Sequence, residues 1–460
     1  MLCEKRRLRA TFLAALGTAV LLAAGCGTEY RSVVTPIATT GPAPQPSAYA
    51  AFISSPSSTS NGVLTVVDYS GDTIIDQAVV GVGPIGFVND QTGVNDFTLN
   101  SDKTLSGVSV SSSFMTRQVT TSTLVTNSTA ANIFSLNNTL YVLDSTNNTV
   151  DILKGNPASF VESINLPLPQ PPIPQVGGPI TATAVSGGER LYAVSQFVAP
   201  GVCNTPASVT VSGVATPIEF ASYTVDTAIP VGKCPVYALS SSDSRRVFVL
   251  NRTDGTVTVI DTVRNTLDTT NPTIQVGCKS LSYNKPCPAG TSSGPVFAEY
   301  YAAGNLLVTA NYDDDTISII DVSLDIYGND SATFGQTVTI PVGSHPDSVT
   351  VLYDGSRAYV ANQADQTVSV VNLTDYTVSK VLSVNGHPRT VVSVKNSLYG
   401  KVYVASPDSP YATIINTDGD IVTVSLLLQG NAVDVRVSSP NATGASSNFL
   451  TTRLPGSGQP

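Results

Sequence analysis

The sequence predicts an all-β fold built from repeated four-stranded units, and three observations carry that prediction. Pairs of short strand-like runs recur along the chain with one fixed offset. Turns that contain glycine and proline follow these pairs at corresponding places. Almost no amphipathic helical pattern is present after residue 25. A repeat this regular determines the architecture, because each unit must bury its apolar faces against its neighbours.

Each unit contains a predicted β-hairpin. Residues 358–362 (Ala-Tyr-Val-Ala-Asn) lead through a four-residue polar loop to residues 367–372 (Thr-Val-Ser-Val-Val-Asn). The polar residues that end the two runs, Asn362 and Asn372, are therefore ten positions apart. The same offset occurs in four more segments: 140–154, 246–261, 307–321 and 402–416. Two β-branched runs joined by a short polar loop indicate a hairpin, and runs with little polar alternation indicate strands that are covered on both faces.

Two further strands complete the unit. A third run, such as 378–384, ends in a turn such as Val-Asn-Gly-His-Pro (384–388), where glycine and proline stop the strand and reverse the chain. A fourth short run, such as 348–353, follows. Four antiparallel strands in a unit of roughly 35–60 residues form the blade of a β-propeller, in which neighbouring sheets cover each other's faces.

One unit resembles the YVTN β-propeller repeat of about forty residues. It contains Tyr-Val-Ala-Asn (359–362), Thr-Val-Ser-Val-Val-Asn (367–372) and Val-Asn-Gly-His-Pro (384–388). The resemblance covers residues 48–437, is strongest in 236–425, and implies the fold while saying little about activity. The unit at 97–125 lacks the fixed offset, and the unit at 181–231 carries a long insertion. We therefore predict a single propeller of seven or eight four-stranded blades and leave the two numbers open.

The C-terminal strand is predicted to close the ring. The first unit begins at 48–53 without an inner strand before it, and an unpaired strand-like run is left over at 432–437. Pairing these two segments would remove an exposed strand edge.

The N-terminus reads as a bacterial lipoprotein signal. A basic start is followed by an apolar stretch at 11–24, too short for a membrane span, and by Leu-Ala-Ala-Gly before Cys26. We expect Cys26 to be acylated and to hold the protein on the outer membrane, facing the periplasm or the cell surface; simple secretion with a free Cys26 is the alternative. The predicted organisation is signal peptide 1–25, flexible tether 26–47, propeller 48–437 and low-complexity tail 438–460.

Four cysteines remain for disulfides once Cys3 is removed with the signal and Cys26 is assigned to lipid. An even number fits an oxidising compartment. Proximity favours Cys203–Cys234 and Cys278–Cys287, each of which would fasten an irregular insertion, although four cysteines allow three connectivities.

The charge of the chain limits its partners. Removal of residues 1–25 takes away four basic residues and one acidic residue, which leaves 19 basic against 32 acidic residues and a net charge of −13. Such a surface disfavours nucleic acid and anionic lipid headgroups. We expect a monomer that reaches the membrane through its lipid.

Two sets of side chains are candidates for a metal or cofactor site. The only histidines, His345 and His387, occupy corresponding turns in consecutive units and could ligate a metal ion or haem. The simpler interpretation is that they are turn residues, since Cys234 holds the same place in another unit. Asp313, Asp314 and Asp315 could hold Ca²⁺, but successive residues do not all point at one centre, and an acidic exposed turn is the commoner interpretation. We expect no cofactor.

The functional prediction is a non-enzymatic scaffold that binds a protein, peptide or glycan at the cell envelope. No Ser-His-Asp arrangement and no phosphate-binding glycine-rich loop is readable in the chain. The alternative is an enzyme, lactonase-like or dehydrogenase-like, with a metal or cofactor in the central funnel; that alternative depends on analogy of fold alone.

Overall fold

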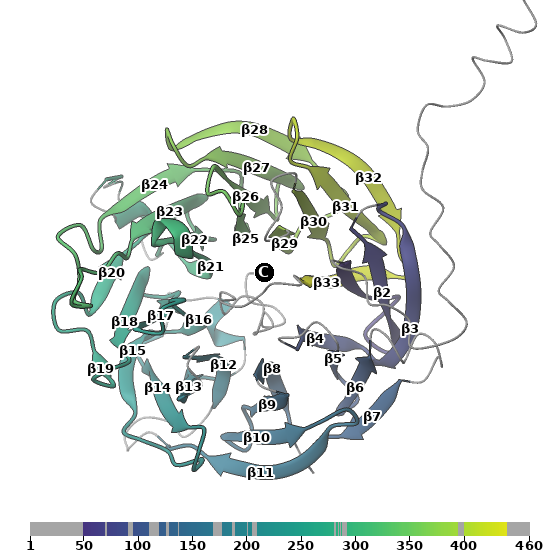
Figure 1. The fold of residues 1–460 in the computed structure, drawn as a ribbon, viewed down its shortest axis with the longest axis horizontal. Coiled ribbons are helices and arrows are strands. Elements are labelled where there is room, and N and C mark those ends of the chain that lie inside the picture. The colour runs from purple at the N-terminus through teal and green to yellow at the C-terminus, as the bar shows by residue number, and fades with distance from the viewer. Residues whose placement is uncertain are drawn as a thin grey trace, which may run out of the picture. The chain divides into compact units, whose positions relative to one another are not determined.

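The computed structural model describes residues 49–438, apart from short segments at 70, 91–94, 110–118, 126–127, 137, 169–176, 186–188, 200, 205–208, 280–281, 284, 286, 288–291 and 394–399. The predicted signal peptide, the tether with Cys26, and the tail beyond 438 lie outside the described residues. The described residues form eight antiparallel sheets of four strands around a common centre, which is an eight-bladed β-propeller (Figure 1). Within this part of the chain, no helix is long and apolar enough to cross a membrane.

We number the blades in chain order, with strands a to d running from the innermost to the outermost. Blade 1 consists of β33 (Asn431–Ser438), β1 (Tyr49–Ser55), β2 (Asn61–Asp68) and β3 (Ile74–Val82), and blade 2 of β4 (Pro84–Asn89), β5 (Asn95–Asn100), β6 (Thr104–Ser109) and β7 (Thr120–Thr123). Blade 3 consists of β8 (Ala130–Leu136), β9 (Thr139–Asp144), β10 (Thr149–Lys154) and β11 (Ser159–Asn165), and blade 4 of β12 (Pro179–Ala184), β13 (Arg190–Ser195), β14 (Ser212–Glu219) and β15 (Ile229–Lys233).

In blade 5 the outermost position is shared by two short strands, β19 and β20, which both pair with β18. Blade 5 consists of β16 (Pro235–Ser240), β17 (Arg246–Asn251), β18 (Thr256–Asp261), β19 (Thr266–Leu267) and β20 (Thr273–Gln275), and blade 6 of β21 (Pro295–Tyr301), β22 (Leu306–Asn311), β23 (Thr316–Asp321) and β24 (Thr337–Pro341). Blade 7 consists of β25 (Pro346–Val351), β26 (Arg357–Asn362), β27 (Thr367–Asn372) and β28 (Thr377–Ser383), and blade 8 of β29 (Thr390–Ser393), β30 (Lys401–Ala405), β31 (Tyr411–Asn416) and β32 (Ile421–Leu427). Three short 3₁₀ helices lie in connections: η1 (Val202–Asn204), η3 (Gly277–Lys279) and η4 (Ala302–Gly304).

The predicted ring closure is confirmed. Strand β33, from the C-terminal end, pairs antiparallel with β1 and supplies the inner strand of blade 1 (Figure 1). A second link crosses the same junction, because the Lys401 ammonium in blade 8 lies 2.6 Å from the Asp72 carboxylate in blade 1. The ends of the ring are therefore joined by backbone and by side chains.

The structure resolves the number of blades as eight, and the irregular unit at 97–125 belongs to blade 2. Its loop between strands b and c has three residues, 101–103, where the regular units have four. The Asn100 amide consequently donates to Thr104 and Ser106, four and six positions later. A regular unit uses positions five and seven, as Asn362 does with Thr367 and Ser369. The missing residue explains why the ten-residue offset is not visible there.

Both faces of the middle strands are buried, as the apolar runs predict. Every residue of β17 and β18 is buried, because each sheet packs between two neighbours. The tyrosines of strand b extend this packing to the next blade. Tyr192 donates to the Asn265 side chain at 3.0 Å, and Tyr359 hydrogen-bonds Asp420. These tyrosines therefore join neighbouring blades in addition to filling the core.

Antiparallel order brings two kinds of connection to the same end of every blade: the loop between strands b and c, and the link from strand d to strand a of the next blade. We call the surface they form the turn face. The two disulfides and both histidines lie in these connections, so the turn face is where the candidate site is built.

Candidate functional site

The loops between strands b and c of blades 5, 6 and 7 begin with the same hydrogen-bond pattern, which we call the asparagine lock. Asn251, Asn311 and Asn362 each end a strand b, and each side-chain amide donates to two hydroxyls on strand c at 2.8–3.1 Å. All three asparagines are buried, so their hydrogen bonds are made away from water, where leaving a donor unpaired is costly. The asparagine lock gives the loops of blades 5, 6 and 7 the same starting point.

The third residue of these loops is an aspartate that holds the neighbouring turn. Asp254 accepts from the Lys233 N–H at 2.8 Å, Asp314 from the Cys278 N–H at 2.6 Å, and Asp365 from the Ser344 N–H at 2.6 Å. A carboxylate that accepts a backbone N–H makes a strong, charge-assisted hydrogen bond. The aspartates fasten the link that enters each blade to the loop of the same blade.

In blades 2, 5, 6 and 7 the first residue of the loop is fastened by its backbone. Its N–H donates to the carbonyl of the residue that precedes the proline opening strand a. The four pairs are Ser101 to Gly83, Arg252 to Cys234, Tyr312 to Gly294 and Gln363 to His345, at 2.8–2.9 Å. These carbonyl-bearing residues all have positive φ, between 48° and 62°, a conformation that favours glycine. Cys234 and His345 therefore carry side chains at a position where glycine is easier to place.

Three large side chains at this first loop position contact one another across blades 5, 6 and 7. The Arg252 guanidinium carbon lies 5.1 Å from the centre of the Tyr312 ring, and the Tyr312 hydroxyl donates to the Gln363 Oε1 at 2.7 Å. Arg252 is only 2% exposed, and the other two are also buried. We call this row the polar belt. It forms the floor of a pocket on the turn face.

The pocket has a volume of about 750 Å³. Loops and links of blades 5 to 8 contribute most of its walls, and the insertion of blade 4 contributes one residue. The lining residues are Asn204, Arg252, Tyr312, Asp313, His345, Gln363, Ala364, His387, Pro407 and Asp408. A concave site with a few convergent polar groups, assembled from loops on a rigid scaffold, is the usual form of a ligand site.

His345 stands over the polar belt. Its ring stacks on Tyr312 with the centroids 4.5 Å apart and the planes 20° from parallel. Its backbone N–H donates to Asp315 at 2.8 Å, and its φ is 53°. The side chain is exposed, so its ring is an aromatic surface at the mouth of the pocket.

His387, which also lines the pocket, forms a pair with Asp408. Its Nδ1 lies 2.5 Å from Asp408 Oδ2, its backbone N–H donates to Oδ1 at 2.7 Å, and its Nε2 lies 3.2 Å from the Gln366 amide. Partial burial alone raises the pKa of the Asp408 carboxyl, but the hydrogen bonds from the His387 ring and backbone outweigh burial and hold that pKa below its ordinary value. Asp408 is thus a carboxylate held in place by one histidine.

The three consecutive aspartates of blade 6 point to different partners. Asp313 accepts from Arg252 Nε and Nη2 at 3.1 and 2.9 Å, Asp314 accepts from Cys278 N, and Asp315 accepts from His345 N. The structure therefore does not bring them together as a Ca²⁺ site. Burial raises the pKa of Asp314 to about 6, against the hydrogen bonds from Thr316 and Cys278 that lower it.

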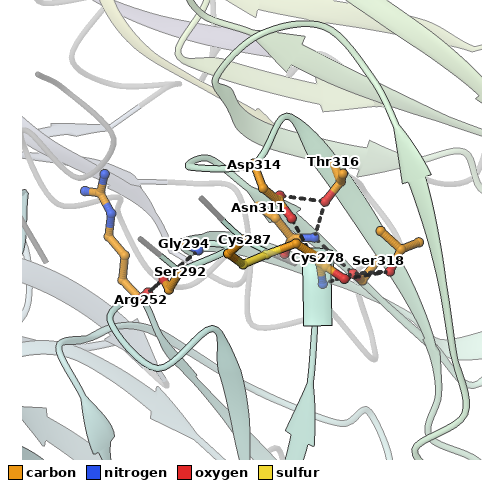
Figure 2. The surroundings of a disulfide bond; sticks show 11 residues. Arg252, Cys278, Cys287, Ser292, Gly294, Asn311, Asp314, Thr316 and Ser318 are labelled. Carbon is orange, nitrogen blue, oxygen red and sulfur yellow. Dashed lines mark hydrogen bonds between the residues drawn. A yellow bond between two sulfur atoms is a disulfide. The ribbon is translucent and has the colours of Figure 1, made fainter. Parts of the chain in front are cut away.

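Both predicted disulfide pairings are present, and both fasten turn-face connections. Cys203, in the blade 4 insertion, joins Cys234 beside strand β16, with the Cα atoms 5.5 Å apart. Cys278 and Cys287, with Cα atoms 5.4 Å apart, lie in the link between blades 5 and 6. Figure 2 shows how this link is held: Asp314 accepts from Cys278 N, and Ser292 donates to the Arg252 carbonyl at the edge of the polar belt.

The structure places both candidate histidines in the lining of one pocket, where His345 contacts Tyr312 and His387 contacts Asp408. Across the described parts of 49–438, no group of three His, Cys, Asp or Glu side chains is arranged to hold a metal ion. Sequence reasoning missed Arg252, Tyr312, Gln363 and the Asp408 partner of His387. One signal was available: the first loop position is serine in blades 2 and 3 but arginine, tyrosine and glutamine in blades 5 to 7.

Fold and pocket together define the class: an eight-bladed β-propeller with a loop-built pocket on its turn face. Several solved structures share the fold. Apo AztD from Citrobacter koseri aligns over 85% of this chain and 98% of its own, with a TM-score of 0.54 and 12% identity. The dihydro-heme d1 dehydrogenase NirN, in complex with DHE, aligns over 92% of this chain and 79% of its own, with a TM-score of 0.59 and 11% identity.

A putative 6-phosphogluconolactonase from Bacteroides fragilis aligns over 85% of this chain and 98% of its own, with a TM-score of 0.51 and 11% identity. At these identities the likeness shows the fold alone. No protein-family model matches the chain, and no curated protein matches it.

Proposed function

We propose that this protein is a binding module of the bacterial cell envelope, held to the outer membrane by a lipid on Cys26, which presents the turn-face pocket to a protein, peptide or glycan. The observation that carries the proposal is the pocket itself. Its floor is a buried row of polar side chains, and two disulfides fasten the connections beside it. A rigid surface with polar groups fixed in advance binds without a large loss of conformational entropy.

Two features of the chain, its disulfides and its N-terminal sequence, support the proposed location in the cell envelope. Disulfides form and persist in oxidising compartments, and the structure has two. The basic start, short apolar stretch and small residues before Cys26 have the form of a lipoprotein signal. We also propose that the blades are YVTN-type repeats that act as a monomeric scaffold, since Tyr359 and Asn362 hold fixed structural places in their blade.

The anchor is tested by growing expressing cells with a labelled fatty acid. Wild-type protein is expected to incorporate the label and to fractionate with the outer membrane. Cys26→Ser is expected to lose the label and to be released on cell lysis. Label retained by the variant, or wild-type protein without label, would reject the lipid anchor.

The binding role is tested by photocrosslinking in intact cells. A photoreactive amino acid at Ala364, inside the pocket, is expected to give discrete adducts in the envelope. The same amino acid at Val79, exposed on the outer strand of blade 1, is the matched control. No adduct at position 364, or the same adducts from both positions, would count against a ligand in the pocket.

A second candidate function is an enzyme, and the observation that favours it is the His387–Asp408 pair, since a carboxylate that orients an imidazole is the arrangement of a general base. The Gln366 amide lies beside Nε2, and among the described residues no hydroxyl or thiol hydrogen-bonds to the His387 ring. Hydrolysis of a lactone panel that is abolished in His387→Gln would favour this function over the binding role.

A further inference from the structure

The guanidinium that lines the pocket already has an anionic partner within it. Arg252 forms a two-pronged ion pair with Asp313, and Asp408 is hydrogen-bonded to the His387 ring. The remaining nearby carboxylate, Asp315, accepts the His345 backbone N–H. The Arg252 guanidinium is therefore already paired and is not free to form an ion pair with an anionic ligand. The chain as a whole is acidic, which adds a further penalty for an anion.

The pocket also offers one open aromatic surface. Tyr312 has the Arg252 guanidinium near its ring and the His345 ring stacked against it. The hydroxyl of Tyr312 is used by Gln363. The surface left for a ligand is the ring of His345, which is exposed at the mouth of the pocket.

Hydrogen-bond donors and acceptors surround this ring in a mixture. Gln363 uses its amide oxygen for Tyr312, which leaves its NH₂ group for a ligand. Arg252 Nη1 is buried and has no hydrogen-bond partner among the described residues, although Nε and Nη2 are satisfied. Asn204 adds a side-chain amide, and the Asp408 carboxylate adds acceptor lone pairs.

We propose that the turn-face pocket binds a neutral saccharide, with one sugar ring stacked on His345. Each sugar hydroxyl both donates and accepts, which suits the mixed amide, guanidinium and carboxylate groups. The C–H face of the sugar ring suits a flat aromatic surface. The inference deepens the proposed binding function and rests on it. The structure favours a sugar over a peptide because the pocket is built from loops and side chains, with none of its lining residues in a β-strand that could pair with an extended chain.

The test is calorimetric titration of the full chain, purified with its anchor in a detergent whose headgroup is not a sugar. The ligands are maltotriose, cellotriose and N-acetylated chitotriose. At least one is expected to bind with a Kd on the order of 0.1 mM, because hydrogen bonds to a sugar replace hydrogen bonds to water and gain little each. Fully deacetylated chitotriose, which is cationic, is the matched ligand and is expected to bind no more tightly than the acetylated form, because the sugar hydroxyls and not ligand charge carry the recognition.

Three variants assign the binding to the proposed ring. His345→Gly is expected to raise the Kd for the sugar about tenfold, the usual effect of losing one ring contact. His345→Phe keeps an aromatic face and is expected to restore most of the affinity. Ser101→Ala changes a turn-face residue of blade 2 that does not line the pocket, and this variant is expected to bind the sugar as wild type does.

The possible outcomes separate the two proposals. No binding of any neutral trisaccharide, equal binding by His345→Gly, or tighter binding of the cationic form would overturn the saccharide assignment. If a neutral ten-residue peptide bound instead, in a manner that depended on His345, the saccharide would be wrong and the binding module would stand. If position 364 gave no crosslink in cells and neither ligand bound, both would fall.

Discussion

Blades 2 and 7 use the same backbone arrangement on the turn face and carry different side chains on it. In blade 2 the first loop residue and its carbonyl partner are Ser101 and Gly83; in blade 7 they are Gln363 and His345. The hydrogen bond between the two backbones is 2.9 Å in both blades, and φ of the partner is 55° in one and 53° in the other. Only the side chains distinguish a plain turn from a wall of the pocket.

The surroundings explain why each blade accepts its own residue. A Cβ on Gly83 would clash with the backbone carbonyl of Ser58 in the preceding loop. In blade 7 the corresponding preceding loop contains Tyr312, and its ring packs against His345. The repeat therefore provides a fixed backbone, and the pocket is found where several consecutive blades place large polar residues at the same position.

Loss of Arg252 is expected to have the largest effect. Arg252→Met leaves Asp313, which is only 18% exposed, without its partner, at a cost of about 3 kcal/mol of unfolding free energy. Urea unfolding followed by circular dichroism measures this. The double variant Arg252→Met/Asp313→Asn should recover part of the loss, because no unpaired charge remains. Ser101→Ala, the corresponding change in blade 2, should stay within about 0.5 kcal/mol of wild type. Equal losses in the single and double variants would show that the ion pair is not the cause.

Removal of the Cys203–Cys234 disulfide should cost about 3 kcal/mol, because it closes a loop with a sequence separation of 31 residues. The replacement at 234 sharpens the comparison with Gly83. Cys234 has φ 48°, so Cys203→Ser/Cys234→Gly should be about 1 kcal/mol more stable than Cys203→Ser/Cys234→Ser. The same urea unfolding curves decide this. Equal stability of the two double variants would mean that the backbone at 234 is not strained.

Introducing a side chain at Gly83 should destabilise the protein much more than removing the side chain of His345. Gly83→Ala combines a left-handed conformation with a backbone clash and should cost about 2 kcal/mol or more. His345→Gly loses the stacking contact but relieves the same conformation, so its stability should lie within about 1 kcal/mol of wild type. Thermal melting of both variants measures the difference. Similar melting temperatures for the two would remove the steric distinction between blades 2 and 7.

The sequence predicts the features that depend on residues close together in the chain, and it does not predict those that depend on contacts between blades. The hairpin of blade 7 and the closure by β33 depend on local runs and an unpaired segment, and both were predictable. The count of eight blades was not, because one residue fewer in the loop of blade 2 hides its offset. The pocket was harder still. Arg252, Tyr312 and Gln363 lie about fifty to sixty residues apart, and each looks like an ordinary loop residue until three blades are placed side by side.

The smallest expected effect concerns Asp314, whose carboxylate in blade 6 has the same capping role as Asp365 in blade 7. The pKa of Asp314 is about 6 in the folded protein because it is partly buried, and it is about 3.9 in an unfolded chain. The folded state therefore binds this proton more tightly than the unfolded state. The resulting stability is fully present below about pH 4 and is lost as the pH rises through 6.

Asp314→Asn removes the titration while keeping a side-chain oxygen for the Cys278 N–H. Between pH 4 and pH 7, wild type should lose about 1–2 kcal/mol of unfolding free energy relative to this variant, a figure reduced for the partial solvent exposure of the carboxyl. Urea unfolding at several pH values measures the difference, with Asp365→Asn as the matched control at an exposed position. A difference between wild type and Asp314→Asn that is constant with pH, or that grows towards pH 4 in favour of the variant, would contradict the role of burial. A pH-dependent difference from wild type that occurs for Asp314→Asn and is absent for Asp365→Asn would show that burial, and not the capping role that the two carboxylates share, is the cause.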